Sequence, residues 1–183
     1  MSARLQGARL YLRPLAAADC TPRYLGWLQD PQVNRFLETR FAEQSLARIQ
    51  EFVAAVNARA DEHLYGIFLR AGDRHIGNIK VGPVNAHHAL ADISLFIGER
   101  DCWGLGYATE AITLASAHAF GALGVRKLAA GMYAPNVGSY RAFVKAGYRE
   151  ESRRPGHYLL EGRPCDILEL GCTRGDLRVP PPA

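Results

Sequence analysis

Two glycines, Gly104 and Gly106, stand between an apolar run typical of a strand and an alanine-rich run typical of a helix. The segment is CWGLGYATE, residues 102–110. The N-terminus of a helix exposes amide N–H groups and the positive end of the helix dipole, so it favours an anion. Glycine has no Cβ and allows unusual backbone angles, so a ligand can approach the main chain closely. The segment therefore predicts either a phosphate-binding turn or a tight turn without a ligand.

Two common phosphate-binding motifs do not fit this turn. A dinucleotide-binding turn has the pattern G-x-G-x-x-G after an early strand, but Thr109 occupies the third glycine position and the preceding strands look antiparallel. A P-loop needs Gly-Lys followed by Ser or Thr, which this segment lacks. The sequence therefore excludes both the dinucleotide and the P-loop interpretations.

An acidic residue inside an apolar strand is the first candidate for proton transfer. In LADISLFIGE, residues 90–99, strand alternation places Asp92 on the same face as Ser94 and Phe96. An acid at such a position costs free energy unless it has partners. Asp92 is therefore either a candidate general base or a salt-bridged acid at the edge of the sheet.

A mixed sheet must hold these residues. The segment from Leu90 to Met132 has the pattern strand, helix, strand, so its two strands should run parallel. The three strands within residues 63–99 follow one another through short connections, and the last two strands form a hairpin, which favours antiparallel pairing. We expect an α+β fold with a mostly antiparallel sheet and helices on its faces. Strands are predicted near residues 8–15, 63–70, 75–84, 90–99, 127–133, 148–154 and 165–172. Two short helices broken at Pro31 are predicted within residues 17–40, and further helices near 45–57, 107–123 and 137–147.

Several segments of the sequence resemble those of a known family. The segment WGLGYATEA, residues 103–111, looks like the acyl-CoA pyrophosphate loop of the GNAT acetyltransferases, and NVGSYRAFVKAGYRE, residues 136–150, resembles their second motif. LYLRPL and IGNIKVG, residues 10–15 and 76–82, look like two strands of the branch that contains the ribosomal-protein N-terminal acetyltransferases. Nucleotide-amino-sugar acetyltransferases are near relatives of that branch. The resemblance implies a GNAT fold: a twisted sheet of six to seven strands, helices on both faces, and a parallel strand pair at the acyl-CoA site.

The resemblance also implies how acetyl-CoA would be held. Backbone amides of residues 104–109 would bind the pyrophosphate, the strand end at residues 95–97 would pair with pantetheine, and Asn136 would face the thiol. Arg141 or Lys145 would meet the ribose phosphate or would simply lie on a solvated helix face. No metal is expected. The implied cofactor-binding residues are Leu95, Phe96, Ile97, Trp103, Gly104, Leu105, Gly106, Tyr107, Ala108, Thr109, Asn136, Ser139, Arg141 and Lys145.

Three residues are candidates for catalysis. Asp92 falls where histone-type members of the superfamily carry their base glutamate, and Ser139 stands where the ribosomal-protein branch stabilises the departing thiol. His157 has a suitable intrinsic pKa for proton transfer, although it also suits a surface loop between the last two strands. Phe143 departs from the family, because many members carry a proton-donating tyrosine there. That departure keeps open a catalytically silent acyl-CoA-binding module.

The acceptor is expected to be a primary amine of a small molecule. The pattern W-L-x-D-P-x-V-N-R-F-L, residues 27–37, looks more like the nucleotide-amino-sugar members than the ribosomal-protein enzymes. A protein N-terminus, an antibiotic or a polyamine are the alternative acceptors. For each single residue, ordinary helix packing or a solvated surface is the competing interpretation. The candidate substrate-binding residues are Trp27, Asn34, Arg35, His87 and Tyr158.

Composition sets the remaining limits. The chain has 183 residues, 48% of them hydrophobic, and a formal net charge of +4. No Lys/Arg cluster with interleaved aromatics points to nucleic acid, and no segment predicts a signal peptide or a membrane span, so a cytoplasmic location is expected. Its four cysteines form no C-x-x-C pair and are expected to be free thiols. We predict one domain over residues 1–175 and an extended Pro-rich tail over 176–183. The resemblance makes a homodimer a candidate assembly, because dimers are common in that branch.

Overall fold

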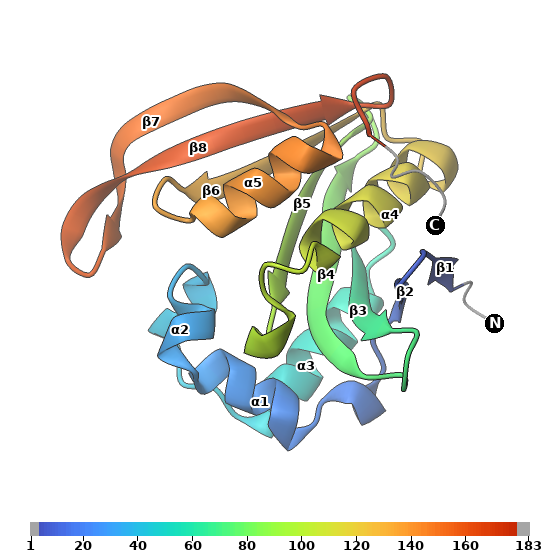
Figure 1. Cartoon of the computed structure of the whole chain (residues 1–183), viewed down its shortest axis with the longest axis vertical. Helices are drawn as coiled ribbons and strands as arrows, with labels where there is room; N and C mark the ends of the chain where they lie inside the picture. The colour runs from blue at the N-terminus through green and yellow to red at the C-terminus, as the bar shows by residue number, and fades with distance from the viewer. Residues whose placement is uncertain (1–3, 179–183) are drawn as a thin grey trace.

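An eight-stranded sheet forms the centre of the computed structural model, which describes residues 4–178 (Figure 1). The strand order is β1-β2-β3-β4-β5-β6-β8-β7, and every neighbouring pair except β5–β6 is antiparallel. The predicted fold class is therefore confirmed, with a short first strand added to the expected six or seven. The strands are β1 (Leu5–Gln6), β2 (Leu10–Pro14), β3 (His63–Leu69), β4 (His75–Asn85), β5 (Leu90–Ile97), β6 (Lys127–Tyr133), β7 (Arg149–Leu160) and β8 (Arg163–Thr173).

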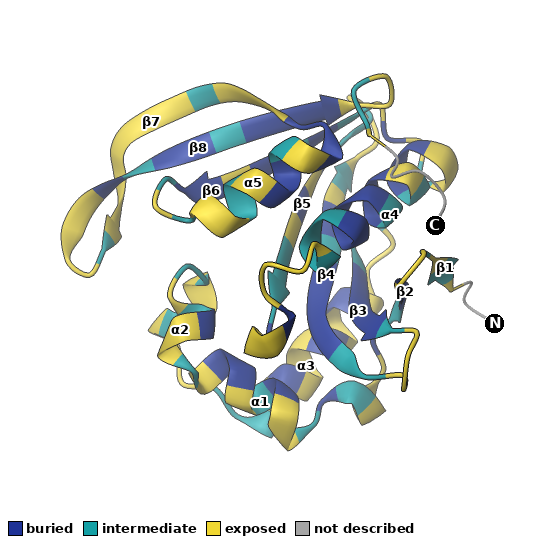
Figure 2. Ribbon diagram, viewed as in Figure 1, coloured by how far each residue is buried: buried dark blue, intermediate teal, exposed yellow. Residues whose placement is uncertain are grey.

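Helices cover both faces of the sheet. On β3, Leu64 packs with α1 and α3, whereas Tyr65 and Ile67 belong to the core under α4 and α5, as strand alternation requires. Figure 2 shows buried residues on the sides of α4 and α5 that face the sheet, while most of β7 is exposed. None of the helices within residues 4–178 combines the length and apolarity that crossing a bilayer requires. The helices are η1 (Ala17–Asp19), α1 (Pro22–Gln29), α2 (Pro31–Asn34), η2 (Glu38–Phe41), α3 (Leu46–Asn57), η3 (Arg100–Cys102), α4 (Tyr107–Ala122) and α5 (Val137–Ala146).

Local sequence signals explain several helix boundaries. Thr21 and Ser45 cap α1 and α3, each with a side-chain oxygen that accepts from a backbone amide in the first turn. Asn136 caps α5 in the same way, because its side chain accepts from the Ser139 amide. Gly147 ends α5 in the left-handed region at φ 108°, and a Cβ there would lie 2.1 Å from the Asp176 carbonyl oxygen. These caps fix where each helix starts and stops relative to the sheet.

The parallel pair β5–β6 is short. Only three residue pairs are in register, from Leu90 with Lys127 to Asp92 with Ala129. Beyond them the two strands diverge. Residues 93–97 of β5 still pair with β4, but their other edge, which faces β6, has no strand partner within the described chain. Helix α4 makes the crossover between these strands, as the strand–helix–strand pattern predicts. The C-terminal ends of β5 and β6 therefore border a gap in the sheet.

The C-terminal part of the chain differs from expectation in two ways. The last two strands are longer than predicted, so residues 155–160 belong to β7 instead of a connecting loop. Residues 176–178 also pack on the body, because the Arg178 amide donates to the Ala146 carbonyl at 2.9 Å. The packed domain therefore extends past the expected boundary at 175, and the rest of the predicted tail, residues 179–183, lies outside the described residues. The four cysteines, Cys20, Cys102, Cys165 and Cys172, are buried free thiols.

Candidate active site

The glycine turn has the backbone geometry that an anion site needs. Gly104 and Gly106 adopt φ values of 73° and 83°, in the left-handed region that favours glycine, and Gly106 is the N-cap of α4. The amide N–H groups of residues 104–109 donate to no other group within residues 4–178. No backbone atom lies within 4 Å of the position a Cβ would take at either glycine. The turn therefore offers a row of free donors, with open space at Gly104 and only the Arg9 guanidinium, 3.3 Å away, beside the Cβ position of Gly106.

A buried carboxylate holds this turn in place. Glu110, in the first turn of α4, accepts from the Arg9 amide at 2.8 Å, the Arg9 Nε at 2.9 Å and the Leu10 amide at 3.3 Å. Arg9 also donates to the Leu105 carbonyl at 2.8 Å and lies over the Tyr107 ring. The start of β2 is thus tied to both ends of the glycine turn. Because Glu110 is only 7% exposed, these donors offset the cost of burying its side chain.

A cavity of about 620 Å³, here called the turn cavity, opens beside the glycine turn. Its walls come from the end of β5, the glycine turn, and the start of α5. Every residue predicted to bind the cofactor lines this cavity except Leu105, whose side chain is exposed and whose carbonyl is taken by Arg9. Arg141 and Lys145 supply positive charge at its wall. The free amides, the open glycines and these cations fit a pyrophosphate-containing ligand.

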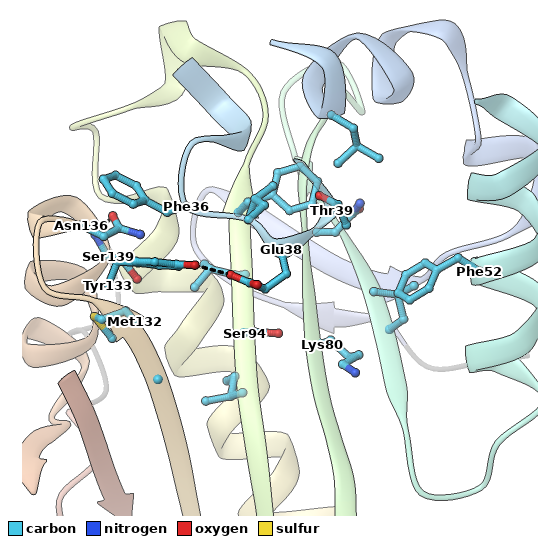
Figure 3. A pocket seen from close by; sticks show the side chains of 18 of the residues that line it. Phe36, Glu38, Thr39, Phe52, Lys80, Ser94, Met132, Tyr133, Asn136 and Ser139 are labelled. Carbon is cyan, nitrogen blue, oxygen red and sulfur yellow. Dashed lines mark hydrogen bonds between the residues drawn. The ribbon is translucent and has the colours of Figure 1, made fainter. Parts of the chain in front are cut away.

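A second cavity of about 630 Å³, the sheet cavity, lies at the gap between β5 and β6 (Figure 3). It is mostly apolar, with residues of α1, α3, α5, η2 and six strands in its walls. Several residues line both cavities, so the two spaces meet at the divergence of the strands. The shared residues are Phe36, Leu37, Leu95, Phe96, Asn136 and Ser139.

A tyrosine at the end of β6 organises one end of the sheet cavity. The Tyr133 hydroxyl donates to Glu38 Oε1 at 2.6 Å and accepts from Arg40 Nη2 at 2.9 Å. Figure 3 shows the Tyr133–Glu38 bond crossing the cavity beside Asn136 and Ser139. Burial, followed by the bond to Glu38, raises the pKa of Tyr133, so its hydroxyl stays protonated at neutral pH. Glu38 thus presents a carboxylate in the cavity with one oxygen fixed in position.

A second carboxylate lines the cavity from β8. Glu169 accepts from the Ser152 hydroxyl at 2.6 Å and pairs with Arg154, both on β7. These bonds, the one from Ser152 first, hold the pKa of Glu169 below its usual range. Glu169 therefore stays ionised, which suits contact with a cation more than removal of a proton.

The structure separates the three predicted catalytic residues. Ser139 lines both cavities, and its hydroxyl has no hydrogen-bond partner within residues 4–178. Asp92 is on the predicted strand face, but it lies before the strands diverge and lines neither cavity. Burial raises the pKa of Asp92, and Lys80 opposes that rise. His157 is an exposed residue of β7, outside both cavity walls, with Nε2 3.1 Å from Arg154 Nη1.

Most of the predicted substrate residues lie elsewhere. Trp27 is 6% exposed in the core under α1, where its indole donates to Glu99 at 2.9 Å, because the apolar face of α1 turns inward. Asn34 satisfies the Leu28 carbonyl at 2.8 Å. Neither residue lines a cavity, which favours the packing interpretation for both.

The other three predicted substrate residues lie in different parts of the structure. Arg35 is exposed and pairs with Glu161 in the β7–β8 turn at 3.0 Å, outside the cavity walls. His87 is in the β4–β5 turn, at the opposite end of β5 from the cavities, and it lines neither. Tyr158 alone lines the sheet cavity, where its ring packs against Tyr133.

Sequence reasoning missed most of the sheet cavity. The overlooked residues come from distant segments, so no local motif brings them together. Strand alternation carried one usable signal, because residues 78 and 80 on β4 share a face with Ser94 and Phe96 across the β4–β5 pair. The missed polar lining residues are Tyr24, Glu38, Thr39, Gln44, Arg48, Asn78, Lys80, Ser94, Tyr133, Arg154 and Glu169. No group of three or more His, Cys, Asp or Glu side chains within residues 4–178 is arranged to hold a metal ion.

The glycine turn, the parallel pair that diverges and the two joined cavities define an acyltransferase-type fold. The chain belongs to the GNAT acetyltransferases: a family model described as "Acetyltransferase (GNAT) domain" matches residues 9–149. Members of this family use acetyl-CoA. The predicted family is thereby confirmed.

Individual similar proteins and solved structures are consistent with membership of this family. "Probable N-acetyltransferase YjcK" of Bacillus subtilis is 29% identical over 158 residues, which cover 80% of this chain and 84% of that protein. Spermidine N-acetyltransferase from Vibrio cholerae, solved with CoA and spermine, superposes with a TM-score of 0.81 at 18% identity and covers 93% of this chain and 98% of that one. RimJ of Mycobacterium smegmatis, solved with CoA-disulfide, gives 0.79 at 19% identity, covering 93% and 84%. The two solved structures support the fold.

Proposed function

We propose that this protein transfers the acetyl group of acetyl-CoA to the primary amine of a small molecule. The observation that carries the proposal is the junction of the two cavities, where Ser139 and Phe96 line both spaces. The turn cavity fits the donor, and the sheet cavity fits an amine-bearing molecule of moderate size. Acetyl-CoA would supply a thioester whose acetyl group passes to the amine while the CoA thiol leaves.

The turn cavity provides what a bound donor needs. Amides of residues 104–109 would hold the pyrophosphate, and Arg141 or Lys145 would meet the ribose phosphate. The unpaired edge of β5 would hydrogen-bond the pantetheine arm through residues 95–97. The Ser139 hydroxyl would donate to the departing sulfur, since Phe143 cannot donate a proton.

The sheet cavity would bring the amine to the junction. An alkylamine has a pKa of about 10, so it must lose a proton before it attacks. We assign this proton transfer to Glu38 in preference to Asp92, because Glu38 lines the cavity and Tyr133 fixes one of its oxygens. Glu169 would attract the ammonium before deprotonation. Aromatic rings and cations in the same walls leave a nucleotide-linked amino sugar as one acceptor candidate.

An acceptor screen tests the proposal. Purified protein is mixed with acetyl-CoA and an amine panel of amino sugar nucleotides, amino acid amides, polyamines and N-terminal peptides. Released CoA thiol is measured together with the mass of the product. We expect amine-dependent thiol release that Glu38→Gln lowers at least tenfold and Asp92→Asn leaves nearly unchanged. CoA binding without turnover on any amine would instead identify a catalytically silent acyl-CoA-binding module.

A further inference from the structure

An asparagine on β4 is the most unusual polar residue in the sheet cavity. Asn78 stands opposite Phe96 on β5, is 3% exposed, and lines the sheet cavity. Its chain neighbours Gly77 and Ile79 are also buried, so the carboxamide can meet solvent or a ligand only through the cavity. A carboxamide in such a place needs hydrogen-bond partners.

The orientation of this amide follows from its neighbour His75. Nε2 of His75 lies 3.0 Å from the Gly77 carbonyl oxygen and 2.8 Å from the Asn78 side chain. A backbone carbonyl can only accept, so Nε2 must carry the hydrogen. The Asn78 atom facing Nε2 must then be the acceptor, Oδ1. This leaves the Nδ2 amino group of Asn78 directed away from His75.

The Nδ2 group has no partner. It is buried and makes no hydrogen bond within residues 4–178. The Tyr24 hydroxyl lies next to Asn78, and this amide lowers the pKa of the phenol as a side-chain hydrogen-bond donor would, but the length and angle between the two groups fall outside those of a formed hydrogen bond. Burial is the larger influence and raises the pKa of Tyr24 to about 12, so this phenol stays protonated at pH 7. Leaving a buried donor unpaired costs about 1–3 kcal/mol.

The surrounding wall has the same donor character. Lys80 follows Asn78 on the same face of β4, and Ser94 stands opposite Lys80 on β5. Figure 3 shows the Lys80 and Ser94 side chains in the cavity. Lys80 is partly neutralised by Glu62, at 3.4 Å, and the two carboxylates that line the cavity, Glu38 and Glu169, come from other elements. This wall therefore suits an oxygen that accepts hydrogen bonds.

We infer that Asn78 selects acceptor amines that also carry a carbonyl oxygen, which receives the Nδ2 hydrogen bond. Asn78 is then a substrate-binding residue, and His75 is a positioning residue that aims it. An oxygen-free polyamine would leave the donor unpaired and would bind less well. This inference rests on the proposed function, since it names the class of amine that enters the same site.

Matched amines test the inference. Phenylalaninamide is compared with 2-phenylethylamine, and leucinamide with 3-methylbutylamine, so each pair differs by one carboxamide. We expect the wild-type protein to prefer the amides by about tenfold in kcat/KM, the value of one hydrogen bond to a buried donor. Asn78→Asp keeps the acceptor for His75 but removes the donor, so the preference should disappear through KM for the amine. KM for acetyl-CoA should not change.

Further variants separate selection from folding. Asn78→Ala should also lose the preference. Asn57→Asp alters an asparagine outside the cavity whose Nδ2 is already bonded to the Leu15 carbonyl, so the preference should persist. His75→Phe keeps the ring beside Phe68 but loses the Nε2 hydrogen, and should reduce the preference severalfold. A purely structural role for His75 would lower activity on both amines equally.

A binding measurement makes the outcome decisive. The side-chain amide signal of Asn78, assigned by its loss in Asn78→Asp, is followed by ¹⁵N NMR with CoA and each amine present. A shift with the amides alone supports the inference. An equal shift, or no shift, with both members of a pair overturns it, as does acetylation of both members with a ratio that Asn78→Asp leaves unchanged. That last result leaves the proposed function intact, whereas absence of thiol release with every amine overturns the proposed function.

Discussion

The turn cavity and the sheet cavity are nearly equal in volume, about 620 and 630 Å³, but they are built from different parts of the chain. Much of the turn cavity comes from two contiguous segments, residues 95–109 and 135–145, and its proposed ligand contacts are largely backbone amides. The sheet cavity draws side chains from segments between residues 24 and 169. A backbone site needs particular glycines at fixed spacing, whereas a side-chain site can change one residue at a time. The first type leaves a motif in the sequence, and the second does not.

The largest effect is expected from a substitution that disrupts the turn cavity. Gly106→Val forces a β-branched residue to φ 83° and places a side chain above the free amides, so we expect CoA affinity to fall at least 100-fold. Calorimetric titration with CoA measures the loss. Gly72→Val is a matched control, because Gly72 has φ 78° in the β3–β4 turn and borders neither cavity. Equal loss of CoA affinity in both variants would show that backbone strain alone is responsible.

The next effect concerns the anchor of the turn. Glu110→Ala removes the acceptor for two backbone amides and the Arg9 guanidinium, and should lower the free energy of unfolding by about 2–3 kcal/mol. Urea unfolding followed by circular dichroism measures the change. CoA affinity should fall in the folded variant, because Arg9 would no longer be held on the Leu105 carbonyl. Unchanged stability would mean that water replaces the carboxylate at no cost.

A smaller effect is expected in the sheet cavity. Tyr158→Ala removes an aromatic wall that is already 44% exposed, so KM for the amine should rise about tenfold while KM for acetyl-CoA stays the same. Steady-state kinetics with each substrate varied in turn gives both constants. Leu159→Ala, at an exposed residue next in the chain that lines neither cavity, should leave both constants unaltered. A parallel rise in both KM values would contradict the division into two cavities.

The difference between the two cavities explains which parts of the fold and site could be predicted from the sequence. Motif spacing was enough for the fold, the parallel pair and nearly all of the turn cavity, because glycine geometry and helix capping are local. Strand alternation predicts the correct face for Asp92. Whether Asp92 reaches a cavity depends on where β5 and β6 diverge, and only the assembled sheet determines that point. Trp27 was expected near the substrate, and the packing of α1 buries it instead. Glu38 and Glu169 lie 131 positions apart and meet only through the folding of the sheet.

The smallest effect is a pH dependence at the wall of the sheet cavity. Burial lowers the pKa of His75, so the folded state holds this ring neutral more firmly than the unfolded state does. Its contribution to stability is complete above the unfolded pKa of about 6.5 and is lost as the pH falls through the window down to the lowered value. His75→Phe should flatten the decline between pH 7 and 5 by less than about 1 kcal/mol, as measured by urea unfolding. An unchanged slope would assign the decline to other groups, such as His118, whose pKa burial also lowers.

Only three residue pairs join β5 to β6, so the sheet consists of two halves, β1–β5 and β6–β8–β7, that meet along a narrow seam. Both cavities lie on that seam, and the remaining support comes largely from α4 packed against α5. Slight opening there would break few hydrogen bonds but would separate Phe96 from Ser139. Such sub-global opening takes less free energy than complete unfolding. We therefore expect mild denaturant to inactivate the protein while its secondary structure is still intact, and the amide hydrogens of β6 that face β5 to exchange before those shared between strands β2, β3 and β4.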